Sequence, residues 1–248
     1  MHLIGHHIIR LEETDSTNNY AYNLLTTNKQ AEGIIVLADH QTKGKGQGDN
    51  QWESEKSLNI LMSLILKPNF LHPSQQFYLN MAISLAVADT VKEVTGKEAL
   101  VKWPNDILVN KKKIAGILIM NTIDSKRINS SIVGIGLNVN QYMFNEHTKN
   151  PTSVIIETGR EQKLDEVFDK LLLNLRNYYF LIENCRFKEL KKLYLKNLLF
   201  FGKEVFLKHR DKGILSGILQ DISEYGEIKV STDKGPIILN HEMVRLII

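Results

Sequence analysis

Short strand-like segments follow one another between residues 100 and 139, and the alternation with helices is missing there. Each segment ends at a polar turn, such as Pro104-Asn105-Asp106 or Asn110-Lys111-Lys112-Lys113. The strand-like segments are Leu100–Lys102, Ile107–Val109, Ile114–Met120 and Ile132–Val139. A doubly wound fold needs strands and helices to alternate, whereas meandering strands with helices laid against one face are typical of an α+β fold. The middle of the chain therefore predicts an α+β fold built on a mixed sheet.

The flanking segments supply the rest of this fold. Apolar runs of strand length and of helical spacing end at glycine, proline and cap-type residues. The expected strands are Ile8–Leu11, Ile34–Ala38 and Leu58–Leu66, and the expected helices are Asn18–Leu25, Pro73 to Gly96, and Leu164–Leu198 with a break near Glu183. These helices are expected to pack against the sheet.

After Gly202 the pattern changes to short strands separated by charged glycine turns. The expected strands are Glu204–Lys208, Gly213–Asp221, Glu227–Ser231, Gly235–Leu239 and Val244–Ile247. Short strands at this spacing suggest a small β-barrel. We therefore expect two domains, a main domain over residues 1–199 and a small C-terminal barrel over residues 200–248, with a boundary near Phe200.

Charge and hydropathy narrow the class of protein. The net charge of +3, from 31 basic and 28 acidic residues, is too small to demand a polyanion as partner. The first residues lack the basic segment and apolar run of a signal peptide, and no later segment approaches the ~20 apolar residues that a membrane span needs. The expectation is a cytoplasmic protein without a membrane partner.

Cysteine and histidine usage argues against several kinds of site. The single cysteine, Cys185, cannot form an internal disulfide, and its helical-looking surroundings predict a packed thiol. The eight histidines, His147 among them, show no metal-ligand spacing. There is no Gly-x-Ser-x-Gly segment, so an acyl-enzyme hydrolase has little support. The sequence predicts no structural metal.

A glycine-rich loop follows the second expected strand, with the sequence Thr42-Lys43-Gly44-Lys45-Gly46-Gln47-Gly48-Asp49. Its backbone N–H groups could approach an anion while the lysines neutralise it, which suits a phosphate. It is not a P-loop, and Asp49 stands where the third glycine of the dinucleotide-binding pattern belongs. A flexible basic turn is the alternative interpretation of such a loop.

Three further segments place polar groups beside expected strands. Pro104 favours a tight turn that aims Asn105 and Asp106 together, although a plain hairpin connection fits the spacing equally well. Lys113 directly precedes an apolar strand, so its ammonium could reach across the sheet face, whereas a lysine run is more often a solvated turn. The strand Gly134-Ile135-Gly136-Leu137-Asn138 exposes its backbone, with simple strand packing as the alternative.

Four motifs, taken in order, resemble those of biotin protein ligases. They are Glu13 to Asn18, Ala38 to Trp52 with the glycine-rich loop, Lys102 to Gly116 with its Lys-Trp-Pro-Asn-Asp and Lys-x-Ala-Gly pair, and Gly134 to Asn138. The Lys-Trp-Pro-Asn-Asp match is highly specific. Pro151-Thr152-Ser153 and the small C-terminal β-domain also fit, so the resemblance covers nearly the whole chain.

The resemblance implies a class II synthetase-like catalytic domain and a two-step reaction. The biotin carboxylate attacks the α-phosphate of ATP to give biotinyl-5′-AMP, and a specific lysine of a carrier domain then attacks this adenylate. ATP and biotin are the implied substrates, Mg²⁺ is expected to assist pyrophosphate departure, and no tightly bound prosthetic group is expected. The implied partner is a biotin carboxyl carrier protein or the biotinyl domain of a carboxylase, and the enzyme is expected to be a monomer or weak homodimer.

The resemblance also implies roles for individual residues. Lys113 is the leading catalytic residue, Lys45 is a second cation, and Asp106 either orients Lys113 or helps to deprotonate the incoming amine. The residues implied to bind biotin are Ser16, Thr17, Gln41, Gly44, Lys45, Lys113, Gly116 and Leu118. Those implied to bind ATP or the adenylate are Gly46, Gln47, Trp52, Lys102, Asn105, Lys113 and Asn138.

The chain departs from the family pattern in two places. Many members carry arginines where this loop has Lys45, Gln47 and Gly48, so point charges replace bidentate phosphate contacts and looser retention of the adenylate is expected. The Ser-Thr-Asn segment begins at Ser16, which leaves no room for the helix-turn-helix domain of some members, so specific DNA binding is not expected. Two alternatives stay open: a lipoate or octanoate ligase or transferase of the same fold, and a non-catalytic biotin-binding protein.

Overall fold

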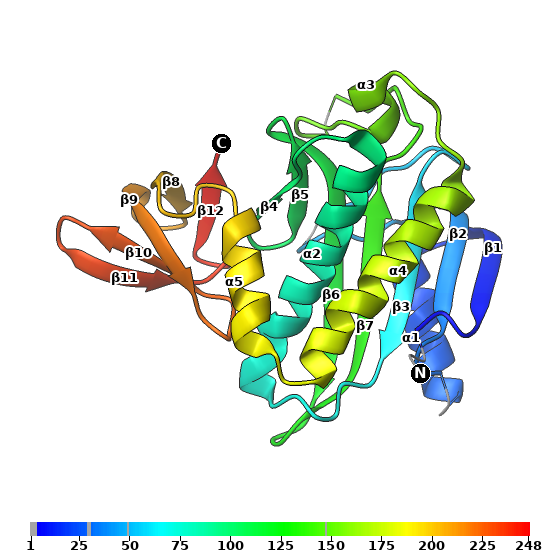
Figure 1. The fold of residues 1–248 in the computed structure, drawn as a ribbon, viewed down its shortest axis with the longest axis horizontal. Coiled ribbons are helices and arrows are strands. Elements are labelled where there is room, and N and C mark those ends of the chain that lie inside the picture. The colour runs from blue at the N-terminus through cyan, green and yellow to red at the C-terminus, as the bar shows by residue number, and fades with distance from the viewer. Residues whose placement is uncertain (1–3, 29–30, 49, 147) are drawn as a thin grey trace.

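A seven-stranded mixed sheet forms the main body of the computed structural model, which describes residues 4–28, 31–48, 50–146 and 148–248 (Figure 1). Its strands are β1 (Ile8–Thr14), β2 (Ile35–Gln41), β3 (Ile60–Leu66), β4 (Leu100–Lys102), β5 (Asp106–Val109), β6 (Lys112–Ile123) and β7 (Ile128–Leu137). They run in the order β1-β2-β3-β7-β6-β5-β4. β1 and β2 pair in parallel and the other neighbours pair antiparallel, which confirms the expected mixed sheet.

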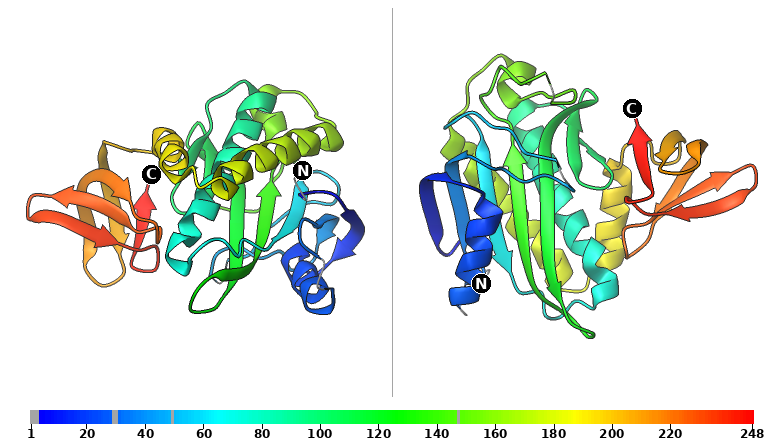
Figure 2. Two further views of the ribbon diagram at one scale, coloured as in Figure 1. Left: turned by 60° about the horizontal axis from the view of Figure 1, so that its bottom comes forward. Right: turned by 180° about the vertical axis from the view of Figure 1, so that it is seen from behind.

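Helices cover both faces of this sheet (Figure 2). They are α1 (Thr17–Thr27), α2 (Gln76–Thr95), α3 (Val154–Thr158), α4 (Leu164–Glu183) and α5 (Phe187–Asn197), with a 3₁₀ turn, η1 (Pro73–Gln75), before α2. α2 packs between the sheet and α4, which is why it is apolar around most of its circumference. α1 packs on the opposite face, against β2, β3 and β7. Because β3 is covered on both faces, all of its residues are buried.

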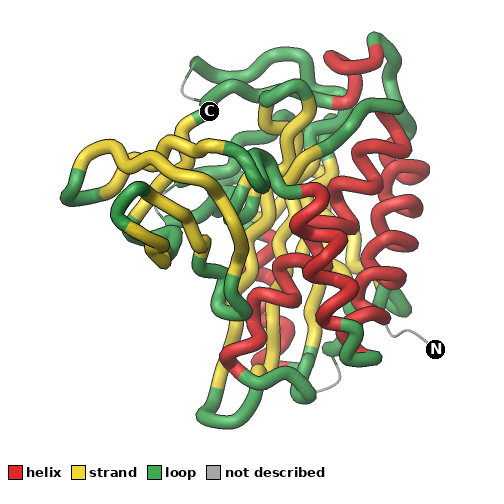
Figure 3. The backbone as a smooth tube through the Cα atoms, turned by 60° about the vertical axis from the view of Figure 1, so that its left-hand side comes forward, coloured by secondary structure: helices red, strands yellow, loops and turns green. Residues whose placement is uncertain are grey.

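The C-terminal segment forms a second, five-stranded antiparallel sheet beside the main body (Figure 3). Its strands are β8 (Glu204–His209), β9 (Gly213–Ile222), β10 (Ile228–Thr232), β11 (Gly235–Leu239) and β12 (Val244–Ile247), in the order β11-β10-β9-β8-β12. Each matches its expected strand to within one residue at either end. Pairing of β11 with β12, which would close a barrel, is not found in the part of the chain that the structure describes. The division at Phe200 stays a prediction.

Aromatic side chains of the main body hold the second sheet at one of its turns. Trp103, which is 3% exposed, donates from Nε1 to the carbonyl of Gly226 at 2.8 Å. The Tyr78 hydroxyl donates to Glu224 at 2.9 Å. Burial, followed by the Glu224 carboxylate, raises the pKa of Tyr78 to about 12, so the phenol stays protonated and can donate. A Cβ on Gly226 would overlap the ring of Phe77, so the glycine lets the second sheet approach α2.

The start of β6 differs from the expectation. Asn110 and Lys111 alone turn the chain, with φ of 51° and 63°, in the manner of a two-residue hairpin turn. β6 therefore begins at Lys112, and Lys113 lies in a strand instead of a turn. The short helix α3 is also absent from the expected elements. It begins where the Oγ of Ser153 accepts a hydrogen bond from the backbone N of Ile156.

The prediction of a packed thiol at Cys185 is wrong. The helical pattern breaks after Glu183, as expected, and Cys185 lies in that break between α4 and α5. Its φ of 54° belongs to a turn, and its side chain is exposed. A position between two helices has no apolar face to pack against, so the helical periodicity of the surrounding residues does not apply to it.

Candidate functional site

A buried polar cluster lies where α1 begins, on the sheet face that α1 covers. Thr17 donates twice to Gln41 Oε1, from its backbone N at 2.7 Å and from Oγ1 at 3.0 Å. The hydroxyl of Ser63, in the middle of β3, lies 2.8 Å from Thr17 Oγ1 and 2.6 Å from Asn18 Oδ1. Ser16, Thr17 and Asn18 are 1%, 3% and 3% exposed. Buried polar groups need such partners, so these side chains hold one another in fixed positions.

Glycines let the backbone approach this cluster closely. Gly134 of β7 lies against Asn18, and a Cβ at that position would overlap the Asn18 carboxamide oxygen. Asn18 Nδ2 also donates to Leu118 O, at 3.4 Å. A Cβ on Gly44, in the glycine-rich loop, would overlap the carbonyl oxygen of Trp52. Side chains at either glycine would therefore displace groups of the cluster or of the loop that covers it.

An ion pair between Lys113 and Asp106 lies further along the same sheet face. Lys113 Nζ is 2.6 Å from Asp106 Oδ1. The ring centroid of Trp52 is 5.4 Å from the same ammonium. A Cβ on Gly116 would stand 2.8 Å from this indole and one on Gly136 would overlap it, so the ring rests directly on both strands. Any ligand that contacts these two glycines has to displace the indole.

Further cations gather beside this ion pair. Lys102 of β4 pairs across the sheet with Asp106 of β5. Burial is the largest cause of the lowered pKa of Lys102; Asp106 opposes the shift, while Lys113, Lys149 and Arg245 add to it. Electrostatic effects of this kind require proximity, so the Lys102 ammonium lies in the field of one carboxylate and three further cations. An excess of positive charge at a sheet end attracts an anionic ligand.

The segment 150–152 fixes the backbone of Lys113 and the side chain of Asn138. Lys113 N donates to Asn150 O at 2.8 Å, and Thr152 N donates to Lys113 O at 2.8 Å. Asn138 Nδ2 donates to Thr152 O at 2.9 Å. Among the described residues, Asn138 Oδ1 and Trp52 Nε1 are buried without a hydrogen-bond partner. Such orphaned polar atoms indicate a place where a polar ligand would complete the hydrogen bonding.

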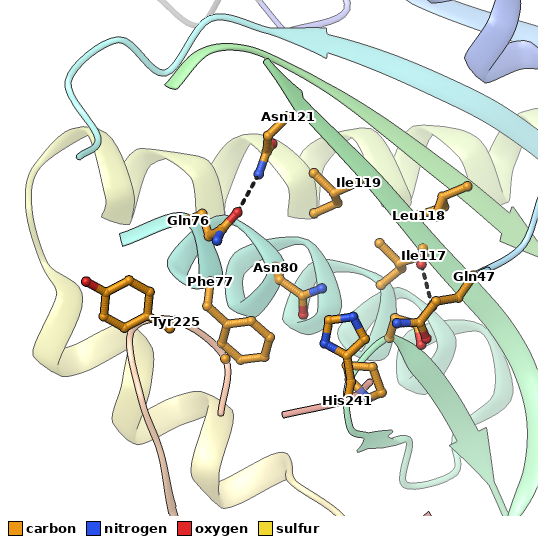
Figure 4. Close-up of a pocket in the computed structure, with 13 residues that line it drawn as sticks. Gln47, Gln76, Phe77, Asn80, Ile117, Leu118, Ile119, Asn121, Tyr225 and His241 are labelled. Carbon is orange, nitrogen blue, oxygen red and sulfur yellow. Dashed lines mark hydrogen bonds between the residues drawn. The ribbon is translucent and has the colours of Figure 1, made fainter. Parts of the chain in front are cut away.

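A cavity of about 190 Å³ opens beside β6, between the start of α2 and the second sheet (Figure 4). On one wall Asn105 Nδ2 donates to Ile117 O at 2.8 Å. On another, Asn121 Nδ2 donates to Gln76 Oε1 at 3.2 Å. The cavity is lined by Gln47, Gln76, Phe77, Asn80, Pro104, Asn105, Ile117, Leu118, Ile119, Asn121, Tyr225, Gly226 and His241. Three residues expected at the site, Gln47, Asn105 and Leu118, thus share one cavity.

Only part of the glycine-rich loop lies at this site: Gln47 lines the cavity, whereas Lys45 contacts α1. Lys45, which the resemblance implies as a second cation, donates from Nζ to Asn19 Oδ1 of α1 at 2.6 Å. Gly46 N donates to Asn50 O at 2.8 Å within the loop. Asp49 of this loop lies outside the described residues, as does His147. The loop therefore contacts α1 through Lys45, and the strand end through Trp52.

The described ranges contain neither a metal-binding group of side chains nor a membrane-spanning helix. No three His, Cys, Asp or Glu side chains gather there in a way that could hold a metal ion. No helix in the same ranges is long and apolar enough to cross a membrane.

Sequence reasoning missed Asn18 and Ser63 as members of the buried cluster, and Lys149 and Arg245 as cations that affect the pKa of Lys102. The hydroxyl of Ser63 interrupts an otherwise apolar buried strand, and this interruption is a signal that could have found it. Asn18 directly follows two residues that the motif already assigned. Lys149 and Arg245 carry no local signal, because only the tertiary fold brings them to Lys102.

The arrangement suits a ligand with two different ends. The cluster around Thr17 and Gln41 offers neutral hydrogen-bonding groups, and the strand end around Lys113 offers positive charge. Gly134 and Gly136 are two residues apart on β7 and therefore face the same side of the sheet, so both ends lie along one surface. Cations fixed beside a carboxylate can stabilise negative charge that develops in a reaction, and the carboxylate can accept a proton.

Comparison with known sequences places the chain among ligases. The model of the biotin/lipoate A/B protein ligase family matches residues 11–138. The bifunctional ligase/repressor BirA of Bacillus subtilis is 32% identical over 238 residues, which covers 94% of this chain and 72% of that protein. A biotin--[acetyl-CoA-carboxylase] ligase of Mycobacterium tuberculosis is 26% identical over 219 residues, with 87% and 80% covered.

A solved structure agrees with this grouping. The biotin protein ligase from Aquifex aeolicus in complex with biotin and ATP superposes with a TM-score of 0.82 and 29% sequence identity. The match covers 98% of this chain and 99% of the Aquifex chain, so it includes the second sheet as well as the main body.

Proposed function

The chain belongs to the biotin/lipoate A/B protein ligase family and is a biotin protein ligase, and we propose that its two clusters bind the two ends of biotinyl-5′-AMP. The enzyme activates biotin with ATP and transfers the biotinyl group to a lysine of a carrier protein. One observation carries the assignment of residues. The neutral cluster at Thr17 and the cations at Lys113 lie along one sheet face, whose glycines let Asn18 and the Trp52 indole rest directly on the strands.

The cluster around Thr17 is proposed to bind the ureido ring of biotin. This ring is neutral and carries two N–H donors and one carbonyl acceptor, so it needs hydroxyl and carboxamide partners. Ser16, Thr17 and Gln41 provide these groups in a nearly buried setting. The apolar remainder of biotin would lie along Gly116 and Leu118 of β6. A small number of fixed polar groups in an otherwise apolar slot is typical of a small-molecule site.

The cation cluster is proposed to serve the first step. A biotin carboxylate oxygen attacks the α-phosphorus of ATP, a new P–O bond forms, and the bond to pyrophosphate breaks. Negative charge builds up on the phosphate oxygens during this exchange. Lys113, Lys102 and Arg245 supply fixed positive charge there, and Asp106 orients the Lys113 ammonium at 2.6 Å. Trp52 Nε1 and Asn138 Oδ1, which are buried without a hydrogen-bond partner among the described residues, would serve the nucleotide.

Asp106 is also proposed to act in the second step. The uncharged amine of the acceptor lysine attacks the acyl carbon of biotinyl-5′-AMP, the acyl–phosphate bond breaks, and AMP leaves with the electron pair. The new amide nitrogen must lose one proton. Asp106 is the carboxylate beside Lys113 that can accept it, since its side chain is 21% exposed and open to a second substrate.

Mg²⁺ is proposed to enter with ATP. The ion usually binds through one or two protein carboxylates, several waters and the phosphates of the substrate, and Asp106 is the carboxylate that this strand end offers. When bound, the ion would stabilise the departing pyrophosphate.

The proposed partner is a biotin carboxyl carrier protein or the biotinyl domain of a carboxylase, in line with the relative named for acetyl-CoA carboxylase. We further propose that the enzyme works as a monomer or weak homodimer, without specific DNA binding. Because the proposed reaction consumes ATP, we expect it to run in the cytoplasm.

Pyrophosphate release tests the proposed substrate. Purified protein is mixed with ATP and Mg²⁺, and with biotin, lipoate or octanoate in parallel. Release with biotin alone is the expected result, because an acyl chain without a ureido ring offers no hydrogen-bonding groups to the polar side chains of Ser16, Thr17 and Gln41. Release with lipoate or octanoate but not with biotin would contradict the assignment of the cluster, and binding of biotin without release would indicate a non-catalytic binding protein.

Replacing Gly134 by alanine is expected to weaken biotin binding about tenfold, because the new Cβ overlaps the Asn18 carboxamide and overpacking costs about 1–3 kcal/mol. Asn18 cannot turn aside freely, since it is 3% exposed and tied to Ser63 at 2.6 Å. Isothermal titration calorimetry with biotin measures the change, with Asn129→Ala in the same strand as control. Unchanged affinity in a folded Gly134→Ala protein would show that Asn18 is mobile and does not set the pocket.

A further inference from the structure

Lys113 is fixed by two segments that are remote in sequence and adjacent in the fold. On one side the Asn110-Lys111 turn leads into β6. On the other, the segment 150–152 pairs with Lys113 through both its N–H and its carbonyl. Asn150 Nδ2 also donates to Lys111 O, at 2.9 Å, which joins the two segments. Together they determine where β6 begins and hence the origin of the Lys113 side chain.

The carboxylate of Glu157, on α3, binds both of these segments. Its Oε1 accepts from Thr152 Oγ1 at 2.7 Å, and its Oε2 accepts from Asn110 Nδ2 at 2.8 Å and from Lys97 Nζ at 2.7 Å. The side chain is 6% exposed. A carboxylate buried to this degree is costly unless it is paired and hydrogen-bonded, and here both oxygens are engaged.

Glu157 stabilises an unfavourable backbone conformation at Asn110. Burial raises its pKa, but the hydrogen bonds from Lys97, Thr152 and Asn110 outweigh burial and keep the pKa below its ordinary value, so the carboxylate is charged at neutral pH. Asn110 and Asn150, with φ of 51° and 46°, both take the left-handed conformation that side-chain-bearing residues adopt rarely. Surrounding contacts must stabilise such residues, and Glu157 supplies one directly to Asn110.

We propose that Glu157 is a positioning residue for Lys113 in the adenylation step, an inference that rests on the proposed function. It acts through Thr152, whose N–H binds the Lys113 carbonyl and whose carbonyl accepts from Asn138 Nδ2. A shift of about 1 Å at a reacting group can lower a rate by as much as ~10²-fold. The cluster around Thr17 shares none of these hydrogen bonds, so biotin binding is left largely intact.

Replacing Glu157 by alanine is expected to lower kcat for biotin-dependent pyrophosphate release about 30-fold, since the strand start that carries Lys113 loses its anchor. KM for biotin is expected to change less than about threefold. Glu157→Gln should keep most of kcat, because its oxygen still accepts from Lys97 and Asn110 while its amide can donate to Thr152 Oγ1. Glu161→Ala, a nearby exposed carboxylate, is the matched control.

A second readout needs no activity. Lys113 is labelled with acetic anhydride on the folded protein and the rate is followed by peptide mass spectrometry. Glu157→Ala is expected to raise the rate about fivefold, because the ammonium is held less firmly against Asp106. Lys191 serves as the internal control: it pairs with Asp221 at 2.8 Å and is 28% exposed, against 32% for Lys113, and its rate should not change.

The outcomes separate this inference from the proposed function. Unchanged kcat together with unchanged Lys113 labelling in Glu157→Ala would overturn the positioning role. A KM for biotin that rises by the same factor as kcat falls would also overturn it. So would faster labelling of Lys191, because the change would then not be specific to Lys113. If Glu157→Ala does not fold, Thr152→Val removes the hydroxyl partner and keeps the shape, with an expected loss of kcat of about tenfold. If the wild-type protein releases no pyrophosphate with biotin, the proposed function fails, and labelling alone decides the role of Glu157.

Discussion

Replacing Lys113 by alanine is expected to lower the rate of biotin-dependent pyrophosphate release by about 10³-fold, the upper range for loss of one charged group that stabilises a transition state. The ammonium lies 2.6 Å from Asp106 and is 32% exposed. Its backbone is fixed on both sides by the 150–152 segment, so it needs little reorganisation during the reaction. Removing it also leaves Asp106 with fewer cations, and the carboxylate then repels the incoming phosphates.

Two control variants sharpen this prediction. Lys112→Ala removes an adjacent, exposed lysine and should leave the rate within about twofold of wild type. Lys113→Arg keeps the charge but replaces a compact ammonium by a planar fork, so an intermediate rate is expected. A Lys113→Ala protein that retains more than about a tenth of the wild-type kcat would remove Lys113 from the reacting groups and direct attention to Lys102 and Arg245.

The largest expected loss of stability follows from replacing Trp103 by alanine. The side chain is 3% exposed and donates to Gly226 O at 2.8 Å. Its ring packs edge to face on the ring of His241, with 6.4 Å between the ring centroids. Truncation of a buried tryptophan costs about 3–5 kcal/mol, which lowers the melting temperature of a chain of this size by roughly 10 °C. The loss includes the buried carbonyl of Gly226, which is left without its donor.

Thermal melting followed by circular dichroism checks this prediction. Trp103→Phe keeps most of the apolar volume and loses the indole N–H, so about a third of the destabilisation is expected. If Trp103→Ala melts within about 2 °C of wild type, the second sheet does not depend on this anchor, and Tyr78 with Glu224 would have to hold it instead.

Elements with strong local signals could be predicted from the sequence. The strands β8 to β12 were expected to within one residue because charged glycine turns separate them at short spacing. The end of α2 was expected at Gly96, whose φ of 67° is a left-handed conformation that glycine adopts without strain. In both cases the residue type determines the backbone locally, so no tertiary information is needed.

Other features depend on contacts that no local pattern contains. Cys185 is expected to be packed from the periodicity of its neighbours, but a left-handed turn between two helices exposes it. α3 spans five residues, too few for a periodic pattern, and its Glu157 shows no sequence signal for its three partners. These features follow from the packing of distant segments.

In the candidate site, too, some features follow from local sequence motifs and others depend on distant contacts. The motif residues form two pairs, Thr17 with Gln41 and Asp106 with Lys113, because each motif lies at a strand or helix end on the same sheet face. The resemblance implies that Lys45 is a second cation of the site, and in the structure its ammonium binds Asn19 on α1. Loop conformation depends on long-range contacts, so composition alone does not determine where such a lysine points.

The position of Arg245 has a consequence for protein synthesis. The guanidinium that influences the pKa of Lys102 lies on β12, so the ribosome must pass residue 245 before this influence can be exerted. A nascent chain that already carries Thr17 and Gln41 therefore still lacks one of the cations that affect the pKa of Lys102. The electrostatic environment of Lys102 is thus complete only when translation has delivered both sheets.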